Sequence, residues 1–286
     1  MSEIAAEAPA AASAVRKRAR LKLGLAPMLG AAIVVLLLVC AFTPQLVAPY
    51  DPLKFDYRAT LQPPSWAHPF GTDNFGRDIL SRTIWAARID LAIAVFCTVF
   101  AVIFGTVVGA FVGYYGGWLD ALFGRIVDLV VTFPFVVIVI AIVAVLGPGL
   151  INMFIAVSAV GWVFYARLMR AEIMSQRNAD YAAAARVLGY GELRIIFRHL
   201  LPNAIGPIIV YWMTDMALAI LLGSSLGYLG LGAQPPTAEW GALIAEGKNF
   251  FNTAWWISVF PGFAIVLAGL AFSLVGDAVA DHFRRR

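Results

Sequence analysis

The residue types that most often carry catalysis are few and scattered in this chain of 286 residues. The three histidines, His68, His199 and His282, are far apart, and neither cysteine, Cys40 or Cys97, has a partner at metal-ligand spacing. Both cysteines lie inside apolar stretches, which is typical of small buried hydrophobic residues rather than of a disulfide framework. We therefore expect no catalytic residue, no metal site and no bound cofactor.

A chain that hydrolysed ATP itself would need a phosphate-binding loop of the form Gly-x-x-x-x-Gly-Lys-Ser/Thr. The nearest approach is Gly247-Lys248, but Asn249 follows it and Ala242 stands where the first glycine is required. The sequence therefore predicts that the chain is not an enzyme.

Asp215 is the one acid expected well inside an apolar stretch. A carboxylate at that depth in a membrane is costly and usually faces a cavity or a partner. We expect it to line a translocation path or to bind a partner helix, with a purely structural polar contact as the alternative.

The segment 180–203 has the most informative pattern. A short alanine-rich helix is followed by the break Gly189-Tyr190-Gly191, and a second amphipathic helix is expected to begin near Glu192 and end at Pro202. A small alanine helix with a sharp glycine exit can dock into a cleft on another protein. The alternative is a basic loop lying on anionic lipid headgroups.

The amino-acid composition indicates which kind of secondary structure positions these residues. Apolar residues make up 61% of the chain and charged residues 13%, against about 25% in soluble domains, and the mean hydropathy is +0.82. The sequence therefore predicts an all-α integral membrane protein with six transmembrane helices of roughly 20 residues. The predicted spans are 25–47, 91–113, 129–146, 150–169, 204–230 and 254–277.

Two of these boundaries required a choice. The stretch from Asp128 to Arg167 is uncharged over almost twice the length of one crossing, and Gly147-Pro148-Gly149 divides it into two antiparallel spans. The first apolar run follows a basic cluster, as in a signal peptide, but it is long and no small-residue cleavage site closes it. An uncleaved first span is therefore predicted.

The distribution of basic residues predicts the orientation. With the N-terminus inside, fifteen of the 21 lysines and arginines lie on inner segments, which follows the positive-inside rule and places both termini in the cytoplasm. The net charge of +4 thus reflects topology and not nucleic-acid binding. The predicted segments are a disordered basic cytoplasmic tail at 1–24, a periplasmic connection at 48–90, a transmembrane core at 91–280 with a cytoplasmic loop at 171–203, and a cytoplasmic basic tail at 281–286.

Gly105, Gly109 and Gly113 recur every four residues in the second predicted span. Small residues at this spacing let two helix backbones approach closely, so we expect a helix-packing face here. The alternative is that glycine is simply common in membrane helices.

The segment 180–203 resembles the conserved cytoplasmic loop of ABC importer permeases, which has Glu-Ala-Ala, a glycine and a later Leu-Pro. The matching positions are Ala183, Ala184, Ala185, Gly189, Leu201 and Pro202, with Ala183 in place of the family's glutamate. Further blocks resemble dipeptide, oligopeptide and nickel permeases of the C-subunit type, although Gly223 stands where relatives often have an acid. These blocks are 49–52, 68–82, 113–120, 133–134, 229–236 and 240–241.

The resemblance implies a type I ABC importer permease that carries di- or oligopeptides across the inner membrane, with nickel chelates or glutathione-like peptides as alternatives. It also implies partners: a homologous second permease forming a heterodimer, two ATPases that bind ATP and Mg²⁺, and a periplasmic or lipid-anchored substrate-binding protein. The segment 180–203 would couple the chain to an ATPase. Membrane lipid is also an expected partner, whereas nucleic acid is not.

Two functions of other classes remain. A secondary transporter working alone would favour inverted repeats, interrupted spans and several intramembrane charges, of which the sequence offers one charge. A membrane scaffold without transport activity would leave the docking pattern without a purpose.

Overall fold

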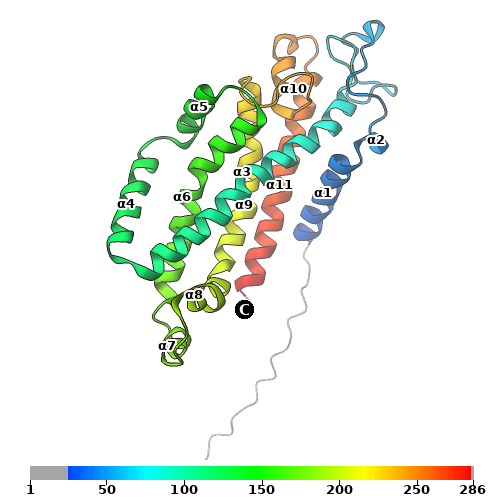
Figure 1. The fold of residues 1–286 in the computed structure, drawn as a ribbon. Helices are drawn as coiled ribbons and strands as arrows, with labels where there is room; N and C mark the ends of the chain where they lie inside the picture. The colour runs from blue at the N-terminus through cyan, green and yellow to red at the C-terminus, as the bar shows by residue number, and fades with distance from the viewer. Residues whose placement is uncertain (1–24, 285–286) are drawn as a thin grey trace, which may run out of the picture.

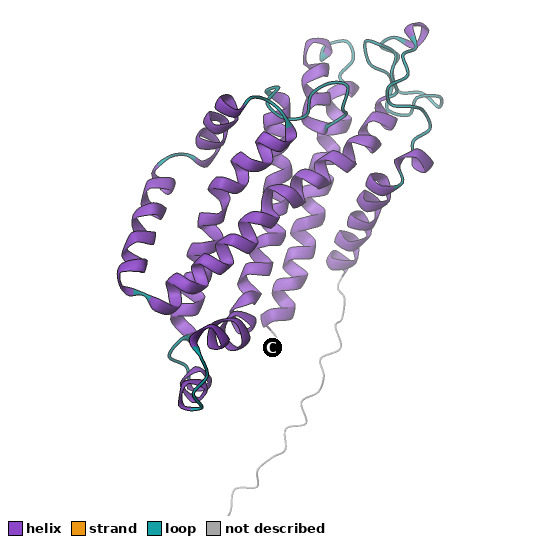
Figure 2. Cartoon of the chain, viewed as in Figure 1, coloured by secondary structure: helices purple, strands orange, loops and turns teal. Residues whose placement is uncertain are grey.

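The structure, a computed structural model, describes residues 25–284. The predicted tail at 1–24 and the last two residues of the predicted tail at 281–286 lie outside this part of the chain. The described residues form helices joined by loops, with no β-strand among them (Figure 2), so the predicted all-α class is confirmed. The longer helices are α1 (Leu25–Phe42), α3 (Ile79–Tyr115), α4 (Gly117–Thr132), α5 (Phe135–Leu146), α6 (Leu150–Gln176), α9 (Leu201–Tyr228) and α11 (Trp256–Arg284). The shorter ones are α2 (Pro44–Val47), α7 (Asp180–Val187), α8 (Glu192–Ile195), α10 (Trp240–Gly247) and the 3₁₀ turns Tyr57–Ala59 and Lys248–Phe250.

The long helices lie side by side and define two ends of the molecule (Figure 1). At one end, uppermost in Figure 1, α10 lies near the loop that joins α2 to α3. At the opposite end lie α7 and α8, and there α1 begins and α11 ends. The two described chain ends therefore share the end that carries the segment 180–203.

Five described helices are long and apolar enough to cross a membrane, and α4 with α5 would make a sixth. These two helices are bent by 86° relative to each other, so the prediction of one continuous span at 129–146 is wrong. The break lies at Phe133 and Pro134. A residue before proline is pushed out of the helical region, and Phe133 is extended at φ −97° and ψ 144°.

α3 is longer than its predicted span and begins at Ile79, inside the predicted connection 48–90. Asp78 caps its start by accepting a hydrogen bond from the backbone N–H of Ser81 at 2.8 Å. The helix ends at Gly116, whose φ of 65° is left-handed. The early start was missed because Arg82 and Asp90 lie in the first turns of the helix, where they bind other groups of the protein and not water.

The break at Gly147-Pro148-Gly149 is confirmed, since α5 ends at Leu146 and α6 begins at Leu150. α6 continues seven residues beyond the predicted end at 169, and α11 runs past the predicted 277 to Arg284. Residues 281–284 of the predicted tail are therefore helical.

The sequence predicted that the second helix of the segment 180–203 ends at Pro202, and this prediction is wrong. The chain stays helical from Glu192 to Tyr228, through a π-helical stretch at Ile196–Leu200. There the N–H of Leu201 donates to the carbonyl of Ile196, five residues back. This wider spacing gives the proline ring room that a regular α-helix would not provide.

α3 packs closely along α6. A β-carbon added at Gly105 would lie 2.7 Å from the Tyr165 Cβ, one at Gly109 would lie 2.9 Å from the Ala166 carbonyl carbon, and one at Gly113 would lie 2.8 Å from the Arg170 carbonyl oxygen. All three positions therefore face the α6 backbone at a distance that only glycine permits.

Candidate functional site

The segment that we expect to couple the chain to an ATPase, residues 180–203 (the coupling segment), begins with α7, and the chain turns sharply at the C-terminal end of this helix. The N–H of Leu188 donates to the carbonyl of Ala184, and that of Tyr190 to Ala185 at 3.2 Å. Gly189 has a φ of 75°, in the left-handed region that favours glycine. This conformation reverses the chain, so that α8 starts at Glu192 as the sequence predicted.

The alanine helix has one buried face and one exposed face. Ala182 and Ala185 are buried against the protein body, whereas Ala183 and Ala184 are exposed. The exposed face continues at the glycine turn, where Val187 is 88% exposed and Leu188 69%. Small and apolar side chains thus cover the outward side of α7 and can meet a second protein.

Two arginines attach α7 to the body of the protein. Arg186 donates to the carbonyl of Arg177 at 2.6 Å, and its guanidinium carbon lies 5.8 Å from the ring centre of Tyr114. Arg177 donates to the carbonyl oxygens of Gly113 and Tyr114 at 3.1 and 3.3 Å. These contacts connect α7 to the ends of α3 and α6.

One side of the helical stretch 192–200 is packed into the core. The amphipathic pattern after Glu192 predicts an apolar face of Leu193, Ile196, Phe197 and Leu200. In the structure Ile195, Ile196 and Leu200 are almost fully buried, while Leu193 and Phe197 are exposed. The buried face is displaced because the π-helical stretch changes the helical spacing. Leu201 and Pro202 lie in the first turn of α9, and Leu201 packs against the same group of buried residues as Ile195, Ile196 and Leu200.

Asp215 lies on α9 and lines a cavity of about 400 Å³ between α3, α5, α6 and α9. Its Oδ2 accepts a hydrogen bond from the Tyr165 hydroxyl of α6 at 2.5 Å. The Tyr165 ring is edge-on to Tyr211, with 4.9 Å between ring centres. Most of the other lining side chains are apolar, so the carboxylate is the single charged group of the cavity wall.

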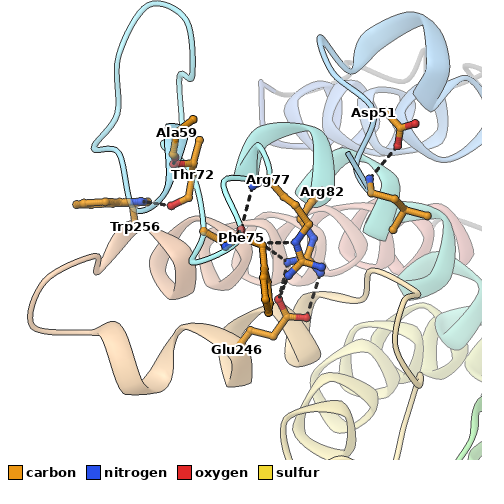
Figure 3. A network of polar contacts seen from close by, with 10 residues as sticks. Asp51, Ala59, Thr72, Phe75, Arg77, Arg82, Glu246 and Trp256 are labelled. Carbon is orange, nitrogen blue, oxygen red and sulfur yellow. Dashed lines mark hydrogen bonds and ion pairs between the residues drawn. The ribbon is translucent and has the colours of Figure 1, made fainter. Parts of the chain in front are cut away.

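A four-residue ion cluster joins the start of α3 to α10 at the opposite end from α7 (Figure 3). Arg77 and Arg82 both bind Asp73, at 2.6 and 3.0 Å, and both bind Glu246, at 2.8 and 2.5 Å. Arg82 is 1% exposed. Burial alone would raise the pKa of Glu246, but the two guanidinium groups outweigh it and hold that pKa below its usual range.

A second buried polar group lies beside the ion cluster, where Glu239 caps α10. The N–H groups of Gly241 and Ala242 donate to its carboxylate at 2.7 and 2.9 Å. Asp90 of α3 accepts from the N–H of Trp240 at 3.1 Å and from Ser224 at 3.2 Å. Burial raises the pKa of Glu239. Two buried acids thus tie α10 to α3 and α9.

The structure brings some of the predicted site residues together and separates others. Residues 183–189 share one exposed end, and Gly105 to Gly113 share one face of α3. Asp215 lies within the helical body, where its partner Tyr165 packs against Gly105. At Gly223, where relatives often have an acid, a β-carbon would lie 2.5 Å from a methyl group of Ile93, so the tight packing there excludes a larger side chain.

Tyr165 and the ion cluster were missed by the sequence analysis. Asp73 and Arg77 are four residues apart, but they lie in the loop before α3, where the helical i,i+4 pairing rule does not apply. Glu246 lies 164 residues from Arg82, and Tyr165 lies 50 residues from Asp215. No local pattern connects residues so far apart.

Comparisons with known proteins agree with this architecture. A family model described as "Binding-protein-dependent transport system inner membrane component" matches residues 105–286. A dipeptide transport system permease of Alkalihalophilus pseudofirmus is 43% identical over 257 residues, covering 87% of this chain and 84% of the relative. A di/tripeptide transport system permease of Pseudomonas aeruginosa is 41% identical, with 88% and 86% covered. A glutathione transport system permease of Shigella flexneri is 43% identical, with 89% and 84% covered.

Proposed function

The chain belongs to the family of binding-protein-dependent transport system inner membrane components, the permeases of type I ABC importers, and we propose that it carries di- or oligopeptides inward. The observation that carries the substrate class is the identity of 41–43% with permeases named for dipeptides and di/tripeptides over nearly the whole chain. A permease does not itself catalyse a reaction, so the energy comes from partner subunits.

The partners follow from the family and from the coupling segment. A homologous second permease forms a heterodimer with this chain, two ATPases bind ATP and Mg²⁺, and a periplasmic or lipid-anchored binding protein delivers the peptide. The exposed face of α7, with Ala183 and Ala184, docks on one ATPase. Its support is the apolar surface at Val187 and Leu188, which no described residue of this chain covers.

The coupling mechanism needs an element that converts movement of the ATPases into movement of membrane helices. α7 is bound to the ends of α3 and α6 through Arg177 and Arg186. When ATP binding draws the two ATPases together, α7 moves with its ATPase and pulls on both helices. The path through the permease then changes from inward-facing to outward-facing.

The chain crosses the inner membrane six times, with α4 and α5 together forming the third crossing and both termini in the cytoplasm. The excess of basic residues on the α7 side supports this orientation, as does the position of the two described chain ends beside α7 and α8. Asp215 then lies between the two membrane surfaces and lines the translocation path.

Gentle detergent purification on a C-terminal tag, followed by mass spectrometry of the co-purifying chains, tests the assembly. We expect a second permease and one or two ATPases to be recovered. Recovery of this chain alone, in several mild detergents and with its neighbouring genes co-expressed, would contradict the importer assembly and favour a transporter working alone.

Glutathione-like peptides are the second substrate candidate, because a permease named for glutathione is as similar as those named for dipeptides. Uptake of radiolabelled dialanine and of glutathione into proteoliposomes that contain the whole assembly distinguishes the two. We expect ATP-dependent uptake of dialanine. Uptake of glutathione without dialanine would replace the proposed substrate.

A further inference from the structure

The cavity beside Asp215 has the size and lining of a small-molecule site. Its volume of about 400 Å³ falls within the roughly 300–1,000 Å³ of such pockets, which are mostly apolar with a few placed polar groups. Phe135, Val157, Phe164 and Leu218 supply apolar wall from three different helices.

In the cavity wall, the hydroxyl groups of Thr98 and Ser225 are hydrogen-bonded within the protein, whereas the Tyr211 hydroxyl and one oxygen of Asp215 have no hydrogen-bond partner among the described residues. Thr98 donates to the Ala94 carbonyl and accepts from Trp212, and Ser225 donates to Leu221 of its own helix. Oδ2 of Asp215 is held by Tyr165, and no described residue donates to its Oδ1. Oδ1 of Asp215 therefore remains available as an acceptor for an occupant.

The charge of Asp215 also lacks a counterion. None of the ion pairs among residues 25–284 includes it, and a carboxylate in apolar surroundings is costly until a cation pairs with it. Ca²⁺ or Mg²⁺ would need about six or more oxygen ligands, and the described residues hold no group of three His, Cys, Asp or Glu side chains that could bind a metal ion. An organic cation that donates N–H groups fits the site better.

We propose that Asp215 binds the α-ammonium group of the peptide as it crosses the membrane, so that the permease itself recognises the peptide's amino end. The ammonium donates to Oδ1, while the Tyr165 hydroxyl keeps the carboxylate in position. Tyr165 is 1% exposed and its ring is fixed against Tyr211; it acts as a positioning residue. The ammonium group can also lie against the face of the Tyr211 ring, which attracts positive charge. This inference rests on the proposed peptide substrate.

The test uses the complete assembly in proteoliposomes, with its binding protein, and measures dialanine uptake and ATP hydrolysis in the same vesicles. In Asp215→Asn we expect uptake per ATP hydrolysed to fall about ten-fold, as for the loss of one charge-assisted hydrogen bond. Asp215→Glu keeps the charge and should recover part of the loss. Asp277→Asn is the matched control, because Asp277 is exposed on α11 outside the cavity and should change the ratio less than about two-fold.

A photoreactive dipeptide with a diazirine in its N-terminal side chain provides a readout of position. In the wild-type assembly we expect crosslinks to Phe135, Phe164 or Leu218, and about ten-fold fewer in Asp215→Asn. A purely structural role of Asp215 would leave the crosslinked residues and their yield unchanged.

Each contrary outcome has a distinct meaning. Unchanged uptake per ATP in Asp215→Asn, with an active wild type, overturns the inference and leaves the proposed function standing. Loss of the second permease from the purified Asp215→Asn assembly would show that Asp215 pairs with a cation of that subunit instead. Absence of dialanine uptake by the wild-type assembly contradicts the proposed substrate, and with it this inference.

Discussion

Arg82 illustrates how a charge inside the protein depends on its partners. It is 1% exposed and contacts both Asp73 and Glu246. Removing one partner of a buried ion pair is far more destabilising than never having made the pair, since the remaining charges stay buried without compensation. Loss of the Arg82 side chain should therefore destabilise the protein mainly because the two carboxylates would be left with Arg77 alone.

Arg82→Met, which keeps most of the side-chain volume, should lower the free energy of unfolding by about 3 kcal/mol. Thermal unfolding of the purified protein measures this. Arg88→Met is the matched control on the same helix, because Arg88 is exposed and forms no ion pair among the described residues. Equal melting temperatures for the two variants would show that the ion cluster contributes little.

At the scale of single helices, glycines of α3 let this helix pack closely against α6. A β-carbon at Gly109 would lie 2.9 Å from the Ala166 backbone carbonyl carbon. Gly109→Ala should therefore force the two helices apart and cost about 1–3 kcal/mol of stability.

Gly124 provides the control for this substitution. It lies within α4, and a β-carbon there would meet no atom within 4 Å. Gly124→Ala should be neutral or stabilising by up to about 1 kcal/mol, since alanine favours helix. Thermal unfolding of both variants gives the comparison, and a similar fall in both would mean that glycine matters here for a reason other than close approach.

At Gly189 the backbone conformation opposes substitution, whereas the surrounding space would admit a larger side chain. Its φ is 75°, and a β-carbon there would meet no atom within 4 Å, so only the backbone opposes substitution. Gly189→Val should strain the turn by at least about 1–2 kcal/mol and displace α7. We expect normal membrane insertion, but peptide uptake uncoupled from ATP hydrolysis in proteoliposomes.

Gly191→Val is the matched control for the turn. Gly191 also has open space around it, but its φ is −64°, which valine adopts readily. Coupling of uptake to hydrolysis should stay near the wild-type value. Normal coupling in Gly189→Val would count heavily against the coupling role of this segment.

The sequence predicted elements where the signal was local. The Gly147-Pro148-Gly149 break and the start of α8 at Glu192 were confirmed, because glycine and proline act on their own backbone. The prediction from sequence was wrong at two prolines. Pro134 bends the predicted span 129–146 by 86°, whereas Pro202 is accommodated by a π-helical stretch that hydropathy does not indicate. Asp215 was chosen as a candidate because it lies within an apolar stretch, but its partner Tyr165 was not, because their contact depends on how α6 packs against α9.

At the scale of the whole molecule, the proposed topology predicts which surfaces face each side of the membrane. Trp66 lies in the loop before α3 and its side chain is fully exposed, and Val187 is exposed at the opposite end. A cysteine replacing Trp66 should react with an impermeant thiol reagent in intact cells. A cysteine replacing Val187 should react only after the membrane is permeabilised.

The labelling experiment needs a background without the native cysteines, so Cys40 and Cys97 are first changed to alanine. The two single-cysteine proteins then control for each other, because each reports one side of the membrane. Labelling of both in intact cells, or of Val187→Cys alone, would overturn the proposed orientation of the termini and of the coupling segment.

The ion cluster also has a consequence for biosynthesis. Asp73 precedes Arg82 by nine residues, but Glu246 follows it by 164. At the roughly 5–20 residues per second of translation, Glu246 leaves the ribosome on the order of 10 s after Arg82. During that interval Arg77 and Arg82 share one carboxylate, so the start of α3 reaches its final environment only after α10 has been made. A nascent chain that stops short of Glu246 keeps two cations and one anion at that site.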